Sequence, residues 1–358
     1  MTECIEYFSK KKVLITGGMG FIGGNLAVTL LDAGAHVTIL DADCGTNRLS
    51  ALSQCASRSS ADFVEVDLAV AGKAERLIAS GFDHIFHCAG VATVEEGLES
   101  PSYTISTNIN CALTVLEGIR NSREASAPVI ILSSDKVYGE VEEPGGASET
   151  TPLRPGGTYD GSKAAVEIIA QSYQARYGLP ITILRLCNIY GPFDAHVTSR
   201  LVPKTFCRIY NRLIPELYIS AHAHSREYLF IRDLVGAILL IARDERAWGE
   251  IYNVSGNCCL STRHMMRLII ESALEIESDG HHSLSIVELQ KYLEELPESP
   301  NPVGNYRAIR RTRLDNGKIV AKVGFAPQTT IRDGLRATAI HYRSMFCNPL
   351  GMFAHIVD

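Results

Sequence analysis

Three glycines spaced three residues apart lie between an apolar segment and a helical segment near the start of the chain. Residues 12–16 have the β-branched, apolar character of a buried strand, Gly17, Gly20 and Gly23 follow, and residues 25–33 suit a helix. Glycines at such a turn let a phosphate or another backbone approach closely, and the start of the helix offers free N–H groups. This pattern predicts the first strand–turn–helix unit of a dinucleotide-binding fold.

A second expected strand, residues 37–41, ends in Asp41. In dinucleotide-binding folds a carboxylate about 20 residues after the glycine turn binds the adenosine ribose and disfavours a 2′-phosphate. We therefore expect NAD as the cofactor. The glycine spacing, G-x-x-G-x-x-G, differs from the usual fingerprint, and Arg48 leaves NADP as an alternative.

Strand and helix patterns continue to alternate along the first half of the chain. We expect further strands at 63–66, 84–87, 129–132 and 181–186, and helices at 71–80, 103–122 and 161–177. Such alternation predicts right-handed crossovers and an α/β fold of the Rossmann type, with a doubly wound parallel sheet.

The pattern loosens after Pro192, where prolines divide the chain into short elements. With 358 residues the chain is long enough for a second lobe. We expect residues 1–191 to form the NAD-binding domain and 192–343 to form mostly a smaller C-terminal substrate-binding lobe, from which some segments return to the sheet. Residues 344–358 are expected to be a tail.

Composition and charge exclude several classes of protein. A net charge of −6 without a basic stripe argues against a nucleic-acid partner. Neither an apolar run long enough to cross a membrane nor an apolar leader is evident. We expect no membrane partner and a cytoplasmic location.

The ten cysteines lack any C-x-x-C pair, and Cys258 and Cys259 are adjacent. We interpret them as reduced thiols, mostly in the core. His222, His224, His281 and His282 have no carboxylate or cysteine at a spacing typical of a metal site. We expect no bound metal.

Tyr159 and Lys163 are four residues apart near the start of an expected helix. This spacing places both side chains on one face, where the ammonium of Lys163 would lower the phenol pKa from about 10. A tyrosinate beside a nicotinamide can take a proton from a hydroxyl while hydride leaves the same carbon. The pair predicts a redox enzyme.

Together these residues resemble the extended short-chain dehydrogenase/reductases that act on nucleotide sugars. The resemblance covers about residues 12–342. Besides the glycine turn, Asp41 and the Tyr159/Lys163 pair, it rests on Asp67-Leu68, His87-Cys88-Ala89-Gly90, Asn108, Ser133-Ser134-Asp135-Lys136-Val137-Tyr138-Gly139, residues 185–192, Arg226-Glu227-Tyr228 with Asp233, and Val323-Gly324-Phe325-Ala326-Pro327.

The resemblance implies roles for individual residues. Asn188 and Arg226 would bind the substrate diphosphate, and the helices at 103–122 and 161–177 would pair across a homodimer axis, although burial within one subunit is the alternative. The residues that would bind NAD are Gly17, Gly20, Phe21, Ile22, Gly23, Asp41, Asp67, Leu68, Ala89, Asn108 and Lys163.

The segment Ser134-Asp135-Lys136 indicates the reaction. Epimerases of this family carry unreactive groups after the serine, whereas sugar 4,6-dehydratases carry an acid followed by a base. The common thymidine-nucleotide dehydratases have Asp-Glu, and the Asp-Lys pair is similar to the cytidine-nucleotide glucose 4,6-dehydratases. The resemblance therefore implies a dehydratase that acts on a nucleotide-diphosphate sugar.

The expected mechanism uses five catalytic residues. Tyr159 removes the proton of the carbon-4 hydroxyl as hydride passes to NAD⁺, and Ser134 and Lys163 hold the geometry. Lys136 takes the carbon-5 proton, Asp135 protonates the departing carbon-6 hydroxyl, and hydride returns to carbon 6.

Several alternatives stay open. Lys136 could instead bind the substrate or orient Asp135, and the two could form an idle surface ion pair. A 4-epimerase or a sugar-acid decarboxylase of the same fold is the nearest other function, and a non-catalytic NAD-binding protein is a more distant one. Residues 93–97 and 217–225 differ from the family pattern at the positions where the family contacts the hexose and the base. The resemblance therefore does not predict which residues of this chain make those contacts.

Overall fold

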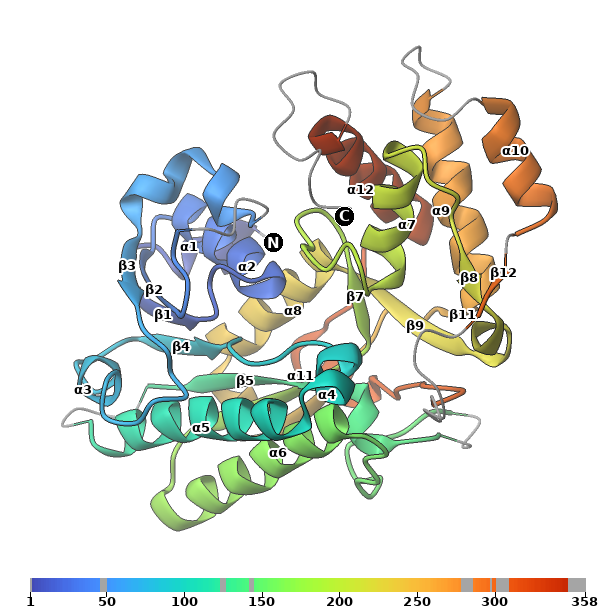
Figure 1. Ribbon diagram of the computed structural model, residues 1–358. Helices are drawn as coiled ribbons and strands as arrows, with labels where there is room; N and C mark the ends of the chain where they lie inside the picture. The colour runs from blue at the N-terminus through green and yellow to red at the C-terminus, as the bar shows by residue number, and fades with distance from the viewer. Residues whose placement is uncertain are drawn as a thin grey trace.

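The computed structural model describes residues 2–45, 50–122, 127–141, 145–277, 286–296, 298–300 and 309–346. Arg48, His281 and His282 lie outside these residues. The described chain forms a parallel sheet covered by helices, with a smaller lobe of helices beside it (Figure 1).

The central sheet has seven strands, all parallel, in the order β10-β6-β5-β4-β1-β2-β3. This order confirms the Rossmann-type α/β fold expected from the sequence. The strands are β1 (Lys12–Thr16), β2 (His36–Asp41), β3 (Asp62–Glu65), β4 (His84–His87), β5 (Val129–Ser134), β6 (Ile181–Leu186) and β10 (Ile251–Val254).

Helices cover both faces of this sheet because successive strand residues point to opposite sides. In β1, Val13 and Ile15 belong to one hydrophobic cluster and Leu14 to the other. The first cluster includes α2 (Phe21–Asp32) and α8 (Ile231–Arg243), and the second includes α5 (Pro101–Arg120) and α6 (Thr158–Tyr177).

The expected helix at 71–80 is much shorter in the structure. Only α3 (Glu75–Ile78) is helical, and Gly72 upstream has a positive φ of 85°, which an α-helix does not accommodate. The helix expected at 25–33 is α2, which begins earlier, at Phe21, so the last glycine of the turn lies inside it.

The C-terminal lobe consists of α7 (Leu201–Tyr210), α9 (Thr262–Glu277), α10 (Ile286–Glu294) and α12 (Ile331–Phe346), which stand together in Figure 1. Two small sheets lie between this lobe and the central sheet. The first consists of β11 (Cys259–Ser261), β9 (Ser225–Phe230) and β7 (Asn188–Tyr190). The second consists of β12 (Glu298–Ser299) and β8 (Leu217–Tyr218).

Two elements from the second half of the chain, α8 and β10, return to the central sheet, and α12 extends three residues into the expected tail. The remaining helices are α1 (Thr2–Glu6), α4 (Val94–Glu99) and α11 (Gly317–Val323).

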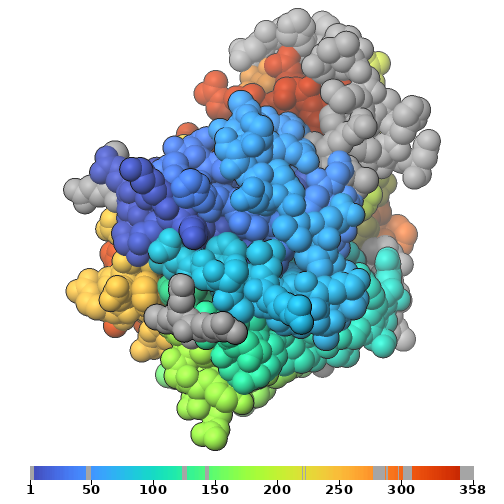
Figure 2. Space-filling view, turned by 90° about the vertical axis from the view of Figure 1, so that its left-hand side faces the viewer, coloured from blue at the N-terminus to red at the C-terminus, as the bar shows by residue number. Residues whose placement is uncertain are grey.

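Figure 2 shows the face on the β3 side of the molecule. Segments from the first third of the chain, blue to cyan, cover most of this face, and residues of the C-terminal lobe rise above it. Within the described ranges, no helix combines the length and the apolar composition that a membrane span requires.

Candidate active site

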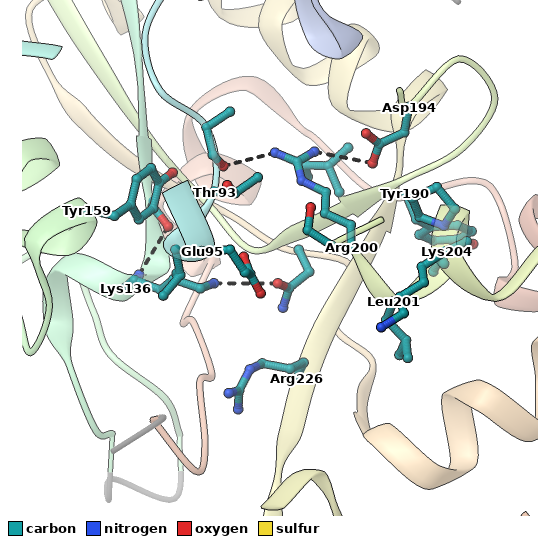
Figure 3. Close-up of a pocket in the computed structure, with 18 of the residues that line it drawn as sticks. Thr93, Glu95, Lys136, Tyr159, Tyr190, Asp194, Arg200, Leu201, Lys204 and Arg226 are labelled. Atoms are coloured by element: carbon teal, nitrogen blue, oxygen red, sulfur yellow. Dashed lines mark hydrogen bonds and ion pairs between the residues drawn. The ribbon is translucent and has the colours of Figure 1, made fainter. Parts of the chain in front are cut away.

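A cavity of about 440 Å³ lies between the central sheet and the C-terminal lobe. Its sheet side is formed where β4, β5 and β6 end, at Cys88, Ser134 and Leu186, and its lobe side by residues from β7 to β9. Open α/β sheets bind ligands at the carboxyl ends of their strands. In Figure 3, Tyr159 and Lys136 face the cavity from the sheet, with Tyr190 and Lys204 opposite.

The glycine turn leaves no room for side chains. Gly17 has φ +68°, and a Cβ there would lie 2.7 Å from the backbone of Ala89. A Cβ at Gly23 would overlap the carbonyl oxygen of Gly17. The two positions therefore require glycine, as the sequence predicted for a turn on which a dinucleotide rests.

The start of α2 is suited to bind phosphate. Gly20 is the N-cap residue and provides no side-chain hydrogen bond to the first turn. Phe21 is buried and Ile22 lines the cavity. The first N–H groups of α2 are thus not capped by a side chain, and together with the helix dipole they fit a pyrophosphate.

Asp41 ends β2 beside the glycine turn. Its Oδ2 accepts a hydrogen bond of 2.9 Å from the Met19 N–H, and Oδ1 accepts one of 3.3 Å from the Asp43 N–H. Burial raises the pKa of Asp41, which these backbone N–H groups oppose. A carboxylate at the end of the second strand disfavours a 2′-phosphate in folds of this type, so the contact of Asp41 with the adenosine ribose of NAD stays a prediction.

The other predicted NAD ligands differ in their surroundings. Asp67 is exposed, Leu68 is buried, and the Ala89 N–H donates to the Thr16 hydroxyl at 3.3 Å. Asn108 is buried; it accepts from the Val91 N–H at 2.7 Å and donates to the Ser162 hydroxyl at 2.8 Å. In the described structure Asn108 thus orders the loop after β4.

Ser134, Asp135 and Lys136 lie together where β5 ends. Ser134 caps the short 3₁₀ turn Asp135–Tyr138, with its hydroxyl 3.2 Å from Asp135 Oδ1 and 3.3 Å from the Lys136 N–H. Lys136 Nζ lies 3.1 Å from Asp135 Oδ1 and donates to Asn188 Oδ1 at 3.5 Å. Lys136 lines the cavity, so the pair is not a solvated surface ion pair.

Asp135 lies behind Lys136. Its side chain is 1% exposed, it is not among the residues that line the cavity, and its Oδ2 has no hydrogen-bond partner in the described part of the chain. A buried carboxylate oxygen without a partner is rare in proteins. This oxygen is therefore available to carry or pass on a proton.

Tyr159 and Lys163 lie one turn apart on α6 and both line the cavity, as expected. The expected lowering of the Tyr159 pKa is not found. Burial raises the pKa of Tyr159 to about 12, and the opposing effects come from the Arg200 charge and the Ser134 hydroxyl. Lys163 Nζ donates to the Leu132 carbonyl at 3.2 Å, and burial lowers the pKa of Lys163 itself.

A buried polar network supports this catalytic turn from behind. Arg185 donates to Glu167 Oε2 at 2.6 Å and to the Tyr138 hydroxyl at 2.7 Å, and Ser133 donates to Glu167 Oε1 at 2.5 Å. Glu167 and Arg185 are almost fully buried. Because Ser133 and Tyr138 flank the catalytic residues, the network fixes the turn that carries them.

The two predicted diphosphate ligands both line the cavity. Asn188 donates to the Glu227 carbonyl at 3.2 Å and accepts from Lys136. The Arg226 guanidinium donates to the carbonyls of Ser225, Ile309 and Arg310. Arg226 is therefore held in place by backbone groups, and in Figure 3 it lies apart from the other labelled side chains of the cavity.

Sequence reasoning missed several residues that line the cavity. Arg200, Lys204, Tyr218 and His224 line it on the lobe side, and Glu95 of α4 lines it on the sheet side. Lys204 Nζ lies over the Tyr218 ring, 4.4 Å from its centroid, and donates to the Tyr218 hydroxyl. These residues follow no local spacing rule, because only the tertiary structure brings them together. Among the described residues, no group of three or more His, Cys, Asp or Glu could hold a metal ion.

Comparison with known proteins agrees with this geometry. A model of the NAD dependent epimerase/dehydratase family matches residues 13–255. A curated protein from Streptomyces griseus, named dTDP-glucose 4,6-dehydratase, is 29% identical over 334 residues, which cover 92% of this chain and 93% of that protein.

Solved structures include both reaction types. A dTDP-glucose 4,6-dehydratase from Streptomyces venezuelae, crystallised with NAD, superposes with a TM-score of 0.77 at 27% identity and covers 93% of this chain and 97% of its own. A UDP-glucose 4-epimerase from Thermus thermophilus, in complex with NAD, has a TM-score of 0.74 at 28% identity, covering 92% of this chain and 98% of its own.

Proposed function

The chain belongs to the NAD dependent epimerase/dehydratase family, and we propose that within this family it is a nucleotide-sugar 4,6-dehydratase. It converts a nucleotide-diphosphate hexose into the corresponding 4-keto-6-deoxyhexose. The chain is an NAD-dependent enzyme, and the cofactor rests on the glycine turn and the start of α2, beside Asp41.

The observation that carries this proposal is the position of Lys136. Its ammonium faces the same cavity as Tyr159, is paired with a buried aspartate, and lies within 3.5 Å of Asn188. An epimerase needs a group that moves the hydroxyl proton, but elimination of water needs a further acid and a further base. Asp135 and Lys136 provide these two groups beside Tyr159.

Bound NAD⁺ supplies the hydride acceptor and later the hydride donor. Tyr159 accepts the proton of the carbon-4 hydroxyl, and the Ser134 hydroxyl orients that group. Lys163 fixes the floor of the cavity through the Leu132 carbonyl, and its ammonium adds positive charge below the cofactor site. The ketone formed at carbon 4 acidifies the hydrogen at carbon 5.

The elimination uses the Asp135–Lys136 pair as a unit. Transfer of one proton from the ammonium to the carboxylate yields an amine and a carboxylic acid. The amine takes the proton from carbon 5, the acid supplies one to the departing carbon-6 hydroxyl, and the ion pair is restored as water leaves. The Lys136 ammonium then returns a proton to carbon 5 as carbon 6 is reduced, and the proton that Tyr159 accepted restores the starting charges. Because Asp135 lies behind Lys136, its proton reaches the sugar either by rotation of the Asp135 side chain or through Lys136.

The lobe side of the cavity has the charge that a nucleotide diphosphate requires. Arg226 approaches from β9, and Lys204 and Arg208 approach from α7. Guanidinium groups bind phosphate oxygens in a bidentate manner, and an ammonium adds a point charge. Asn188 stays a predicted contact to the same diphosphate.

We further propose that the protein is a homodimer paired through α5 and α6. These helices expose Tyr103 (65%), Ile105 (41%), Ile168 (59%) and Tyr177 (50%). Large apolar side chains left exposed on two neighbouring helices favour a subunit interface. Sedimentation of the wild type and of Ile168→Glu checks this: the wild type should sediment as a dimer and the variant as a monomer. The cytoplasmic location expected from the sequence stays a prediction.

The test is incubation with a panel of dTDP-, CDP-, UDP- and GDP-hexoses. The panel is needed because the curated relative is named for dTDP-glucose, whereas the Asp-Lys motif resembles the cytidine-nucleotide enzymes. A dehydratase yields a product lighter by one water that absorbs near-ultraviolet light in alkali. An epimerase yields an isomer of unchanged mass, and that result would replace the proposal by the alternative of the same fold.

A further inference from the structure

Residues 309–314 form a short segment, which we call the strap, that contacts both sides of the cavity. On the lobe side the strap forms a bridge with Ser225 of β9, and on the sheet side it forms a bridge with Ala147, between the catalytic turn and α6. Its first residue, Ile309, lines the cavity. The strap therefore connects the strand that carries Arg226 with the segment that follows the proposed catalytic residues.

The strap backbone holds the guanidinium of Arg226, which lines the same cavity. This guanidinium donates to the carbonyls of Ser225 and Arg310, each at 2.9 Å, and to the carbonyl of Ile309. Because a guanidinium has more N–H donors than these bonds use, it can still bind a phosphate group. The direction in which Arg226 presents its remaining donors is set by the strap.

Glu140, which follows the catalytic turn, binds the N–H groups of the strap. Its Oε2 accepts a hydrogen bond of 2.7 Å from the Arg310 N–H, and its Oε1 accepts one of 2.9 Å from the Arg311 N–H. Hydrogen bonds from N–H groups to a carboxylate are shorter and stronger than those between neutral groups. Both carboxylate oxygens of Glu140 thus hold the strap, at consecutive residues.

The same two peptide groups bind both Glu140 and Arg226. The Arg310 N–H shares a planar peptide group with the Ile309 carbonyl, and the Arg311 N–H shares the next one with the Arg310 carbonyl. Each group therefore donates to Glu140 through its N–H and accepts from Arg226 through its C=O. Because the N–H and the C=O of a trans peptide point in opposite directions, Glu140 and Arg226 lie on opposite sides of the strap, and their hydrogen bonds polarise one another.

Other contacts hold the strap independently of Glu140. The Leu314 N–H donates to Oε2 of the buried Glu227 at 2.8 Å, and the Ser225 N–H donates to the Arg310 carbonyl at 2.8 Å. Removal of the Glu140 carboxylate should therefore loosen the two peptide groups without releasing the strap or unfolding the protein.

We propose that Glu140 is a positioning residue for substrate binding, which acts through the two peptide groups of the strap to fix the direction in which Arg226 meets the diphosphate. The inference deepens the proposed function and rests on it in one respect, the binding of the diphosphate by Arg226. A residue that directly follows the catalytic turn thus contributes to substrate affinity and not to the chemical steps.

The negative charge of Glu140 makes the sign of the expected effect informative. A carboxylate repels a nearby diphosphate, so removal of Glu140 would strengthen binding if the residue acted on the substrate through its charge alone. If Glu140 acts by holding Arg226, its removal weakens binding. The direction of the change in affinity therefore separates the two roles.

The test measures the Kd of the nucleoside diphosphate, chosen from dTDP, CDP, UDP and GDP, that the wild type binds most tightly. The variants are Glu140→Ala, Glu140→Gln, Arg226→Met and the double variant that combines Glu140→Ala with Arg226→Met. Glu75→Ala is the matched control, because the Glu75 carboxylate also accepts from two backbone N–H groups, those of Gly72 at 2.7 Å and Ala74 at 3.2 Å, in a segment that does not line the cavity. Thermal unfolding and NAD affinity are recorded for each variant, together with kcat and KM for the corresponding nucleotide sugar.

We expect Glu140→Ala to raise this Kd about three- to tenfold, with kcat within about twofold of the wild type. Glu140→Gln should show a smaller rise, because its amide oxygen still accepts a hydrogen bond, and Glu75→Ala should show none. In the Arg226→Met background Glu140→Ala should raise the Kd no further, because the effects of two residues that act through one contact are not additive.

An unchanged or lower Kd in Glu140→Ala would overturn the inference. So would a rise of the same size in the Arg226→Met background, or a rise matched by an equal loss of NAD affinity, because either would mean that Glu140 does not act through Arg226. If the wild type bound none of the four nucleoside diphosphates, the substrate class of the proposed function would fail as well. Nucleotide binding with an unchanged Kd in Glu140→Ala would overturn this inference alone.

Discussion

The two sides of the active-site cleft are formed by different parts of the chain: backbone and strand ends on one side, and long side chains on the other. On the sheet side, the proposed cofactor site is formed by backbone at a glycine turn, and the proposed catalytic groups lie just after β5 and on α6. On the lobe side, the cavity is lined by long charged and aromatic side chains from short elements, such as Lys204 over Tyr218. We therefore propose that the sheet side determines the chemistry and that the lobe side determines which nucleotide sugar enters.

The largest expected effect concerns the sheet side. Tyr159→Phe removes the proton acceptor and keeps the ring, so turnover should fall by about 10²- to 10⁴-fold. NAD affinity and thermal stability should stay near those of the wild type, because the phenol does not hold the glycine turn. Steady-state kinetics and calorimetric titration with NAD check this, and turnover within a few-fold of wild type would remove Tyr159 from the mechanism.

A second prediction concerns the network behind the catalytic turn. Glu167→Gln leaves the buried Arg185 without its anionic partner and should lower the free energy of unfolding by about 3–5 kcal/mol. Denaturant unfolding measures this change.

Glu250→Gln is the control for that measurement. It breaks the exposed pair with Lys318, whose side chains are 35% and 48% accessible, and should cost about 1 kcal/mol or less. If Glu167→Gln and Glu250→Gln lowered the free energy of unfolding equally, burial would not be the reason why one ion pair contributes more to stability than the other.

Acid should destabilise the sheet side through buried histidine. Burial lowers the pKa of His84 to about 4, below its ordinary value of 6.5. The folded state thus disfavours the proton that the unfolded state accepts, so stability is complete above pH 6.5 and is lost as the pH falls toward 4. Between about pH 7 and pH 5 the contribution of His84 to this loss should be about 2 kcal/mol, and His84→Gln should remove that contribution, while His87, whose pKa burial lowers to about 3, keeps its own.

His341 extends the same measurement to the lobe. Burial lowers the pKa of His341 to about 4 as well. However, His341 keeps more contact with solvent than His84 does, because it is only partly buried. We expect a smaller pH-dependent loss from His341 than from His84, measured as the difference between His341→Gln and wild type. A larger change in His341→Gln would place the acid-sensitive region in the lobe.

The smallest effect on stability is expected on the lobe side. Arg208 pairs with Glu216 at 2.8 Å, with side chains 25% and 35% exposed. Arg208→Met should change the free energy of unfolding by about 1 kcal/mol or less and raise KM for the nucleotide sugar without changing NAD affinity. A loss of NAD affinity would contradict the division of labour between the two sides.

This division also explains what could be predicted from the sequence. The glycine turn, the Tyr159/Lys163 spacing and the Asp135–Lys136 pair depend on neighbours in the chain, and the structure places them as expected. The contacts of Arg200 with Asp194 and Ala92 could not be predicted, because they are formed by tertiary structure.

The error concerning the Tyr159 phenol has the same cause. A spacing of four places Lys163 on the correct face, but it does not reveal that the Leu132 carbonyl takes the ammonium or that burial dominates. Helix periodicity similarly predicted a helix at 71–80, although most of this segment is irregular. Residue spacing therefore predicts which groups meet more reliably than it predicts their protonation.

The most direct test of the central claim is a single turnover of Lys136→Ala with a nucleotide hexose that the wild type dehydrates. The account predicts that oxidation at carbon 4 persists, seen as near-ultraviolet absorbance of the reduced cofactor, while no 4-keto-6-deoxy product forms. Formation of that product at the wild-type rate would contradict the assignment of Lys136 to the elimination of water.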